Sequence, residues 1–448
     1  MKRSLLLMAL LAMAMPLLAE FQYDVNEDVK LRLGADIRAR YETFDRTVVA
    51  PGGFPGGNSP ANQYYRFRTR VWTALDFGED VTFNLRLANR SHYVTSSPNK
   101  PNNSHGNHGS TWQFPDETYI DAANIVVRNF LMEHVTLTLG RQALAFGNGL
   151  LFAEGTPFDQ GRSVYTDGLH LRYDNDGTKV SLFALYDTWK DRWPVINDRN
   201  RRLRSGDIFT LGAYATQEFS KAFALDVYYM YNDVEDRQPR EAERNHYADA
   251  SASLHTFGLR AFGRPLDLIS YSLEVARQAG YNNRHGDIRA YMADARLRLH
   301  LPEVMGASPS FGLEAACFSG DKPNDGDTRG WNPLMIQCPL WSEELMPIML
   351  NGNWTNLRFG RVDFTTEQKG KWKFMVSATD YTVMERRGGA MQATGGGDHL
   401  GLLLSADVSY KVCDNLSLLA QFSHFMPGDY YRNGHSGNWA RLEATLSF

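Results

Sequence analysis

The sequence predicts an all-β protein: a transmembrane antiparallel β-barrel of about eighteen strands, with short periplasmic turns and long extracellular loops. Three observations predict this fold. Apolar and charged residues alternate with a period of two, long and short connections alternate along the chain, and the last residues form an amphipathic strand. The composition agrees, because 43% hydrophobic side chains among 448 residues are too many for a disordered chain, and three cysteines cannot build a disulfide scaffold.

Residues 1–19 are expected to be a secretory signal peptide, and residues 20–448 the outer-membrane barrel. Lys2 and Arg3 form a charged start, an apolar run follows, and Ala19 precedes the expected cleavage site. This run is too short for a spanning helix, which needs about 20 apolar residues. No later stretch of the sequence approaches that length, so a helical membrane protein is excluded.

The period of two is clearest between Leu31 and Tyr41, where every odd residue is apolar and every even residue is charged or glycine. A strand points alternate side chains to opposite faces, so one face is apolar and the other ionic. The pattern returns in residues 65–77 and 81–90. A soluble sheet packed on a core can alternate in the same way, so the connections must decide between the two.

Eighteen strands are predicted, with sixteen as the alternative count, and the connections between them alternate strictly between long and short. Short connections include 78–79 and 175–177, and long ones include 45–61 and 320–352. Outer-membrane barrels have this regularity and an even number of strands, whereas sandwiches rarely do. The predicted strands are 30–44, 62–76, 80–94, 117–130, 134–142, 164–174, 178–187, 207–218, 222–232, 251–262, 266–277, 287–300, 308–319, 353–365, 371–384, 398–411, 415–427 and 436–448.

The C-terminal residues 440–448 place an apolar residue at every second position back from Phe448. This pattern resembles the signal by which the barrel assembly machinery recognises its clients, so we expect that machinery as a partner and the cell outer membrane as the location. The sheet must close on itself, because an open edge in lipid would leave backbone N–H and C=O groups unpaired.

No motif of a soluble enzyme stands out in the sequence, so we expect neither enzymatic activity nor a cofactor. Asp321, Asp325 and Asp327 surround a glycine and form a weak calcium candidate, because closely spaced carboxylates can wrap a hard cation. The terminal bidentate glutamate of a calcium loop is missing. Cys317 and Cys338 flank this loop, and the sequence leaves open whether they form a disulfide.

The polar face of the strands is rich in arginine. Where the parity is unambiguous it carries thirteen basic against eight acidic residues, although the whole chain has a net charge of −4. Guanidinium groups in a confined channel concentrate anions and bind carboxylates in fork geometry. The alternative is that arginines and carboxylates only tie the barrel interior together. The basic residues predicted to line the pore are Lys30, Arg32, Arg38, Arg40, Arg66, Arg68, Arg70, Arg86, Arg90, Arg172, Arg296, Arg298 and Arg441.

Three further segments are motif-like: Leu139–Gln142 followed by Phe146 and Gly147, then Asp167–Tyr173, and later Ser319–Asn324. Together they resemble the alginate export family of outer-membrane proteins. The resemblance implies an eighteen-stranded monomeric barrel in which an arginine-rich constriction passes a polyuronate outward and loops restrict the pore.

The resemblance adds Arg141 to the pore-lining candidates and supports Arg172. Simple alternation along its strand would point Arg141 to lipid, so either a bulge near Gly140 intervenes or Arg141 lies at the rim. The sequence departs from the family pattern at Thr166, where the family often has an aromatic residue, and at His170, where it often has arginine.

Three functions remain open. The first is passive passage of an anionic polysaccharide or its oligomers through an arginine-rich lumen. The alternative is a general anion-preferring porin for small solutes, and the third is a binding barrel or a barrel enzyme. Expected partners are outer-membrane lipid and lipopolysaccharide, the assembly machinery and the anionic polysaccharide, but no nucleic acid. The resemblance favours a monomer, whereas many general porins are trimers. Residues 320–352 and 95–116 are long enough to enter the lumen, and the sequence does not say which segment does.

Overall fold

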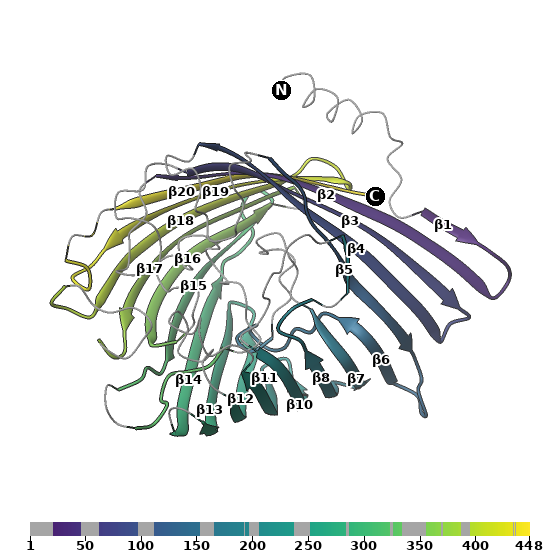
Figure 1. The fold of residues 1–448 in the computed structure, drawn as a ribbon. Helices are drawn as coiled ribbons and strands as arrows, with labels where there is room; N and C mark the ends of the chain where they lie inside the picture. Colours follow the sequence, from purple (N-terminus) through teal and green to yellow (C-terminus); the bar gives the residue numbers. More distant parts are fainter. Residues whose placement is uncertain are drawn as a thin grey trace.

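The computed structural model is a closed antiparallel β-barrel of eighteen strands, joined by two further short strands (Figure 1). It describes residues 21–45, 62–96, 112–152, 165–191, 193–196, 206–236, 251–283, 286–322, 326–333, 355–368, 371–386, 395–432, 434 and 436–448. The barrel strands are β2 (Val29–Asp45), β3 (Asn62–Phe77), β4 (Val81–Ser96), β5 (Trp112–Val127), β6 (Val135–Gln142), β7 (Thr166–Asn175), β8 (Thr178–Asp187), β10 (Gly206–Ser220), β11 (Phe223–Asp236), β12 (Ala252–Leu266), β13 (Ile269–Asn282), β14 (Gly286–His300), β15 (Ala307–Phe318), β16 (Leu357–Gln368), β17 (Trp372–Val383), β18 (His399–Lys411), β19 (Leu416–Pro427) and β20 (Gly437–Ser447). Of the short strands, β1 (Phe21–Asp24) pairs with β2, and β9 (Pro194–Ile196) pairs with β5. None of the described segments is a helix long and apolar enough to cross a membrane.

The barrel closes where β2 pairs with β20, in continuous register from Asp36 opposite Ser447 to Asp45 opposite Asn438. The seam extends to Phe448, whose backbone N–H donates to the carbonyl of Ala35 over 2.8 Å. Each remaining barrel strand pairs with its neighbours along the chain, so the sheet has no open edge along this ring. Closure is the condition for placing such a sheet in lipid.

All eighteen predicted strands are present, and the strand 178–187 has the predicted bounds. The predicted strict alternation of connections is wrong at one place. Only residues 283–285 join β13 to β14, at the end of the barrel where the other connections are long. Asn282 pairs directly with Gly286, whose φ of +78° lies in the left-handed region that glycine tolerates. This tight turn extends β13 five residues beyond its predicted end.

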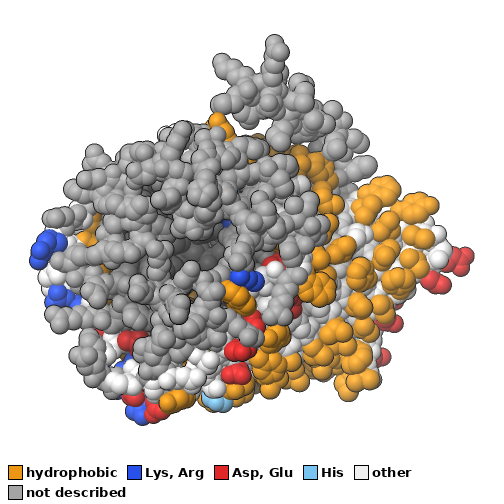
Figure 2. All heavy atoms as spheres, viewed as in Figure 1, with side chains coloured by type: hydrophobic (Ala, Val, Ile, Leu, Met, Phe, Trp, Pro, Cys, Tyr) orange, Lys and Arg blue, Asp and Glu red, His pale blue; other side chains and the backbone are white. Residues whose placement is uncertain are grey.

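The two faces of the wall differ in the way the period of two predicts. In β2, Leu33 and Ile37 are 38% and 44% exposed, whereas Asp36, Arg38 and Arg40 are at most 3% exposed. The exposed face is apolar, and Figure 2 shows hydrophobic side chains spread over the outer wall. An arginine on that face at the middle of a bilayer would cost about 2–4 kcal/mol. The charged positions therefore belong to the inner face.

Ion pairs join the inner faces of the strands at the closing seam. Arg441 on β20 lies 2.7 Å from Glu42 on β2, and Arg40 on β2 lies 2.7 Å from Glu443 on β20. Glu42 also lies 3.3 Å from Arg66 on β3. One fully buried carboxylate thus holds guanidinium groups from the two strands on either side of β2.

Replacing that carboxylate should weaken the seam. In Glu42→Gln the arginines around position 42 lose a buried counter-charge, and breaking such a pair costs about 3–5 kcal/mol. Urea unfolding in lipid vesicles, followed by tryptophan fluorescence, should show this loss of stability. The matched variant Glu218→Gln breaks an exposed pair with Lys179, and should lose no more than about 1 kcal/mol. Equal stability of the two variants would contradict a special role for Glu42.

Candidate functional site

Two rows of arginines lie on the inner face of the barrel, the first across β2, β3 and β4 and the second across β2 and β3. In the first row Arg38 lies directly opposite Arg68, which in turn lies opposite Arg90. In the second row, closer to the long connections, Arg40 lies opposite Arg66. Like charges directly opposite each other destabilise a sheet. These rows therefore are not explained by the stability of the wall alone.

Carboxylates contact several of these arginines. Asp36 accepts hydrogen bonds from Arg70 over 2.6 Å and from Arg68 over 3.5 Å. Glu117 lies opposite Arg90 in the register of β4 and β5. We call Arg38, Arg40, Arg66, Arg68, Arg70, Arg90 and Arg441 the arginine cluster. The carboxylates that contact it or lie opposite its members include Asp36, Glu42, Glu117 and Glu443.

The facing wall, from β11 to β16, carries charges that balance one another. Arg260 donates to Asp226 over 2.7 Å. Arg296 lies between two carboxylates, 2.8 Å from Asp294 and 3.0 Å from Glu314. Alternating charges of this kind stabilise the wall and leave little excess of either sign. The two sides of the barrel therefore differ in electrostatic character.

The connection between β6 and β7 turns back onto the inner face of the barrel, and its described part is residues 143–152. Phe146 stacks on the ring of Tyr214 with 4.7 Å between centroids, and Leu150 and Phe152 are at most 2% exposed. Apolar burial thus holds this segment against the strands that follow it. The sequence did not single out this connection as one that enters the lumen.

Asn148 attaches the tip of this segment to the charged wall. Its Nδ2 donates to Asp294 over 2.9 Å and to Ser272 over 3.0 Å, and its Oδ1 accepts from Arg260 over 3.0 Å. Gly147, with φ of +57°, provides the turn. One amide side chain therefore links the segment to β12, β13 and β14.

A part of the predicted inward connection 320–352 also reaches the inner face. Trp331 is fully buried, and the backbone of Asn332 exchanges two hydrogen bonds with the side chain of Gln278, over 2.9 Å and 2.8 Å. The rest of that connection, and the connection that follows β4, lie outside the described residues.

A cavity of about 920 Å³ lies between the segment 143–152 and the end of the barrel where the connections are short. Cationic side chains from four strands line it: Arg86, Arg172, Lys179 and Arg260. Its acidic lining residues are Asp174 and Asp226. The volume falls in the range of about 300–1,000 Å³ that is usual for small-molecule sites.

The other arginines predicted to line the pore also lie on the inner face, and several are paired. Arg32 donates to Asp76 over 2.7 Å, and Arg86 lies 2.5 Å from Asp121. Arg298 donates to Asp363. Lys30 lies opposite Asp76 in the register of β2 and β3.

Arg141 lies elsewhere, at the rim, which is one of the two alternatives left open by its sequence. β6 pairs with β7 in continuous register, so no bulge intervenes. The guanidinium of Arg141 is buried, 2.7 Å from Asp167 and 3.4 Å from Asp191, and it lies 3.9 Å from the ring centroid of Tyr165. Arg141 therefore ties the end of β6 to its neighbours.

The calcium candidate and the cysteine pair are only partly described. Asp321 accepts a backbone hydrogen bond from Gly330 over 2.7 Å, and Asp327 lies 3.4 Å from Arg329. The described residues contain no group of three possible metal ligands. Cys317 is a free thiol on β15. Asp325 and Cys338 lie outside the described residues.

Sequence reasoning missed Asn148, Arg260 and Arg361 as inner-face residues. The two arginines lie on strands whose parity was ambiguous in the sequence. The signal for Asn148 is present in the sequence as the triplet Gly147-Asn148-Gly149, which favours a turn in the middle of an apolar segment.

Comparisons with known proteins agree on the architecture. A family model described as alginate export matches residues 29–444. A search of the curated proteins gives no significant match.

The barrel is similar to solved structures at low sequence identity. Acinetobacter baumannii OccAB1 is 10% identical, with a TM-score of 0.57 over 93% of this chain and 96% of that chain. Acinetobacter baumannii OccAB2 is 14% identical, with a TM-score of 0.56 over 93% and 98%. Pseudomonas aeruginosa OpdK, solved with vanillate, is 12% identical, with a TM-score of 0.54 over 93% and 98%. At these identities the likeness concerns the fold.

The attachment of the inward segment predicts a change in pore size. Asn148→Ala removes hydrogen bonds to charged groups, each worth about 1.5–3 kcal/mol, and should release the segment tip from β12–β14. Single-channel conductance in planar bilayers should rise, with noisier open states. The matched variant Asn84→Ala removes a hydrogen bond from the Asn84 side chain to the side chain of Asn124. This bond lies on the inner face and does not involve the segment, so the variant should keep the wild-type conductance. A wild-type conductance in Asn148→Ala would show that the segment does not restrict the pore.

Proposed function

This chain belongs to the alginate export family and is an outer-membrane channel, and from that premise we propose that it conducts an anionic polysaccharide or its oligomers passively through an arginine-rich lumen. The observation that carries the proposal is the row Arg38, Arg68, Arg90, in which three guanidinium groups lie in register across neighbouring strands. Neighbouring strands are about 4.8 Å apart. Such a row offers closely spaced cations to a solute with repeated carboxylates.

A passing polyanion offsets the electrostatic cost of the arginine cluster. Guanidinium groups lie directly opposite one another in this cluster, so carboxylate groups of the solute reduce the repulsion between them. Arginine binds carboxylates in fork geometry, and a confined lumen strengthens the attraction relative to bulk water. Multiple weak contacts allow the polymer to enter and also to leave.

The solute gradient drives passage in this proposal, so no cofactor and no catalytic activity are assigned to the chain. The proposed partners are outer-membrane lipid, lipopolysaccharide and the barrel assembly machinery, and the proposed working unit is a monomer. The first role proposed for Arg141 in the pore is replaced by a positioning role at the rim, because its guanidinium is buried among Asp167, Asp191 and Tyr165.

A general anion-preferring porin for small solutes is the second candidate. The 920 Å³ cavity with its four cationic side chains favours it, since that volume suits a small organic anion. OpdK, a structure with a similar fold, was solved with vanillate. The two candidate functions differ in which solute should block the ionic current: a polyuronate for the polysaccharide channel, and small carboxylates for the porin.

Charge reversal in the first arginine row should invert the selectivity of the channel. The wild-type reversal potential under a salt gradient should indicate a preference for anions, and Arg68→Glu should abolish or reverse it, because two charge units change at the centre of the row. Added polymannuronate should block the wild-type current at micromolar concentration and leave Arg68→Glu open. The effect should shrink in 1 M salt, where the screening length is about 3 Å.

The matched control is Arg289→Glu, which makes the same charge change on an exposed side chain of the outer face. It should keep both the selectivity and the block. Block by small carboxylates but not by polymer would leave the porin as the function. Indifference to both, with weak selectivity, would contradict both candidates.

A further inference from the structure

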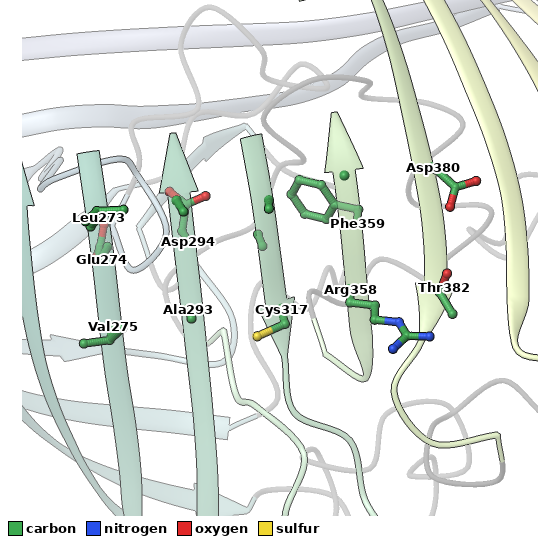
Figure 3. Close-up of a pocket in the computed structure, with 14 residues that line it drawn as sticks. Leu273, Glu274, Val275, Ala293, Asp294, Cys317, Arg358, Phe359, Asp380 and Thr382 are labelled. Carbon is green, nitrogen blue, oxygen red and sulfur yellow. The ribbon is translucent and has the colours of Figure 1, made fainter. Parts of the chain in front are cut away.

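The outer wall of the barrel contains a groove of about 600 Å³ across β13–β17 (Figure 3). Two rows of outward-facing residues form it, each in register across five strands. The row nearer the long connections is Val275, Ala293, Cys317, Arg358 and Thr382. The next row is Leu273, Ala295, Ala315, Gly360 and Asp380. In this second row, three neighbouring strands, β14, β15 and β16, thus contribute small side chains or none.

The floor of the groove is open. A Cβ atom placed on Gly360 would meet no atom within 4 Å. In the row below, Leu297, Leu313 and Val362 are 46%, 54% and 52% exposed and end the groove toward the short turns. Small residues on a lipid-facing wall let a neighbouring chain approach the backbone closely. The groove therefore has the shape of a slot for an extended hydrocarbon chain.

Cationic side chains lie at the end of this groove that is nearer the long connections. Arg358 is 57% exposed in its side chain and lies 3.4 Å from Asp398. Arg277 follows Val275 on the same face of β13, is exposed, and has no ion-pair partner among the described residues. The carboxylate of Asp380, also on the rim, already lies 2.6 Å from His399. Figure 3 shows Arg358 beside Cys317 and Thr382, at the edge of the apolar floor.

We propose that this groove binds one acyl chain of lipopolysaccharide in the outer leaflet, with the phosphates of its lipid A at Arg358 and Arg277. The wall faces lipid because the chain is an outer-membrane barrel, and the long connections mark the extracellular end. Lipopolysaccharide is the lipid of that leaflet, and it combines saturated acyl chains with phosphates. The acyl chain packs on the apolar floor of the groove. Arg358 and Arg277, which lie nearer the long connections, bind the phosphates.

The proposal is independent of the solute that the lumen conducts, because the groove lies on the opposite face of the wall. It commits to lipid rather than to a second copy of the chain. A stable protein interface buries about 800 Å² on each partner, whereas this groove measures about 600 Å³ and has cationic side chains at the end nearer the long connections, which suits a single amphiphile better.

Native mass spectrometry of the full-length barrel, released from detergent with added hexa-acyl bisphosphoryl lipid A, tests the proposal. Wild type should retain one lipid A. Arg358→Ala should lower the retained fraction about fivefold, since one basic residue at a lipid surface contributes on the order of 1 kcal/mol. Gly360→Leu fills the open floor, where a Cβ atom meets nothing within 4 Å, and should abolish retention.

The matched control is Ala184→Leu, which also introduces a leucine side chain on the outward face of β8, far from the groove. It should retain lipid A like wild type. Retention of lipid A by Gly360→Leu and Arg358→Ala at the wild-type level would overturn the site. Equal retention of phosphatidylglycerol by wild type would overturn the commitment to lipopolysaccharide, and a dimer that Gly360→Leu dissociates would assign the groove to a second copy.

Discussion

Every feature of this protein depends on one constraint: in the hydrocarbon of a bilayer, each backbone N–H and C=O must find its partner within the chain. A sheet satisfies it only by closing, and the pairing of β2 with β20 closes this one. Closure assigns one face of each strand to lipid and the other to the lumen. The period of two then collects the charged side chains inside, because they have no stable place on the outer face. The polar interior is therefore a consequence of closing the sheet in lipid. A barrel of eighteen strands is also wide enough to hold segments such as 143–152 in its interior.

The interior charges divide into two kinds. On β14 and β15, Arg296 lies between Asp294 and Glu314, and such pairs stabilise the wall while offering little to a solute. On β2 and β3, Arg38 and Arg68 lie directly opposite each other, an arrangement that opposes folding. Proteins break local rules of stability mainly at functional sites. The difference between the two walls is therefore the reason why we propose the arginine rows, and not the paired charges, as the side chains that act on the contents of the barrel.

The period of two, together with the alternating connections and the C-terminal strand, was enough to predict the fold, since the period shows which residues share a face and the connections distinguish a membrane barrel from a soluble sheet. It predicted all eighteen strands, but not the three-residue turn after β13, which depends on the left-handed backbone of Gly286. It placed most arginines on the inner face, and failed for Arg141, because alternation describes a strand and not the rim where a strand ends. The contacts of Asn148 join residues more than a hundred positions apart. No local pattern contains such a contact, so the inward position of the segment 143–152 emerged only from the structure.

The wall is a single β-sheet, so consecutive residues of one strand belong to opposite faces. Each face can therefore be changed by substitutions that leave the other face intact. On β16, Arg358 and Gly360 face outward, while Phe359 and Arg361 face inward and are at most 5% exposed. Four consecutive residues thus contribute to the outer groove and to the ionic network of the lumen. Because their side chains point to opposite sides, bulk added at Gly360 enters the open slot, where nothing lies within 4 Å of a new Cβ atom. The guanidinium of Arg361 keeps its surroundings. The alternation that forces charge into the lumen therefore also makes the lipid-facing and solute-facing surfaces separable by single substitutions.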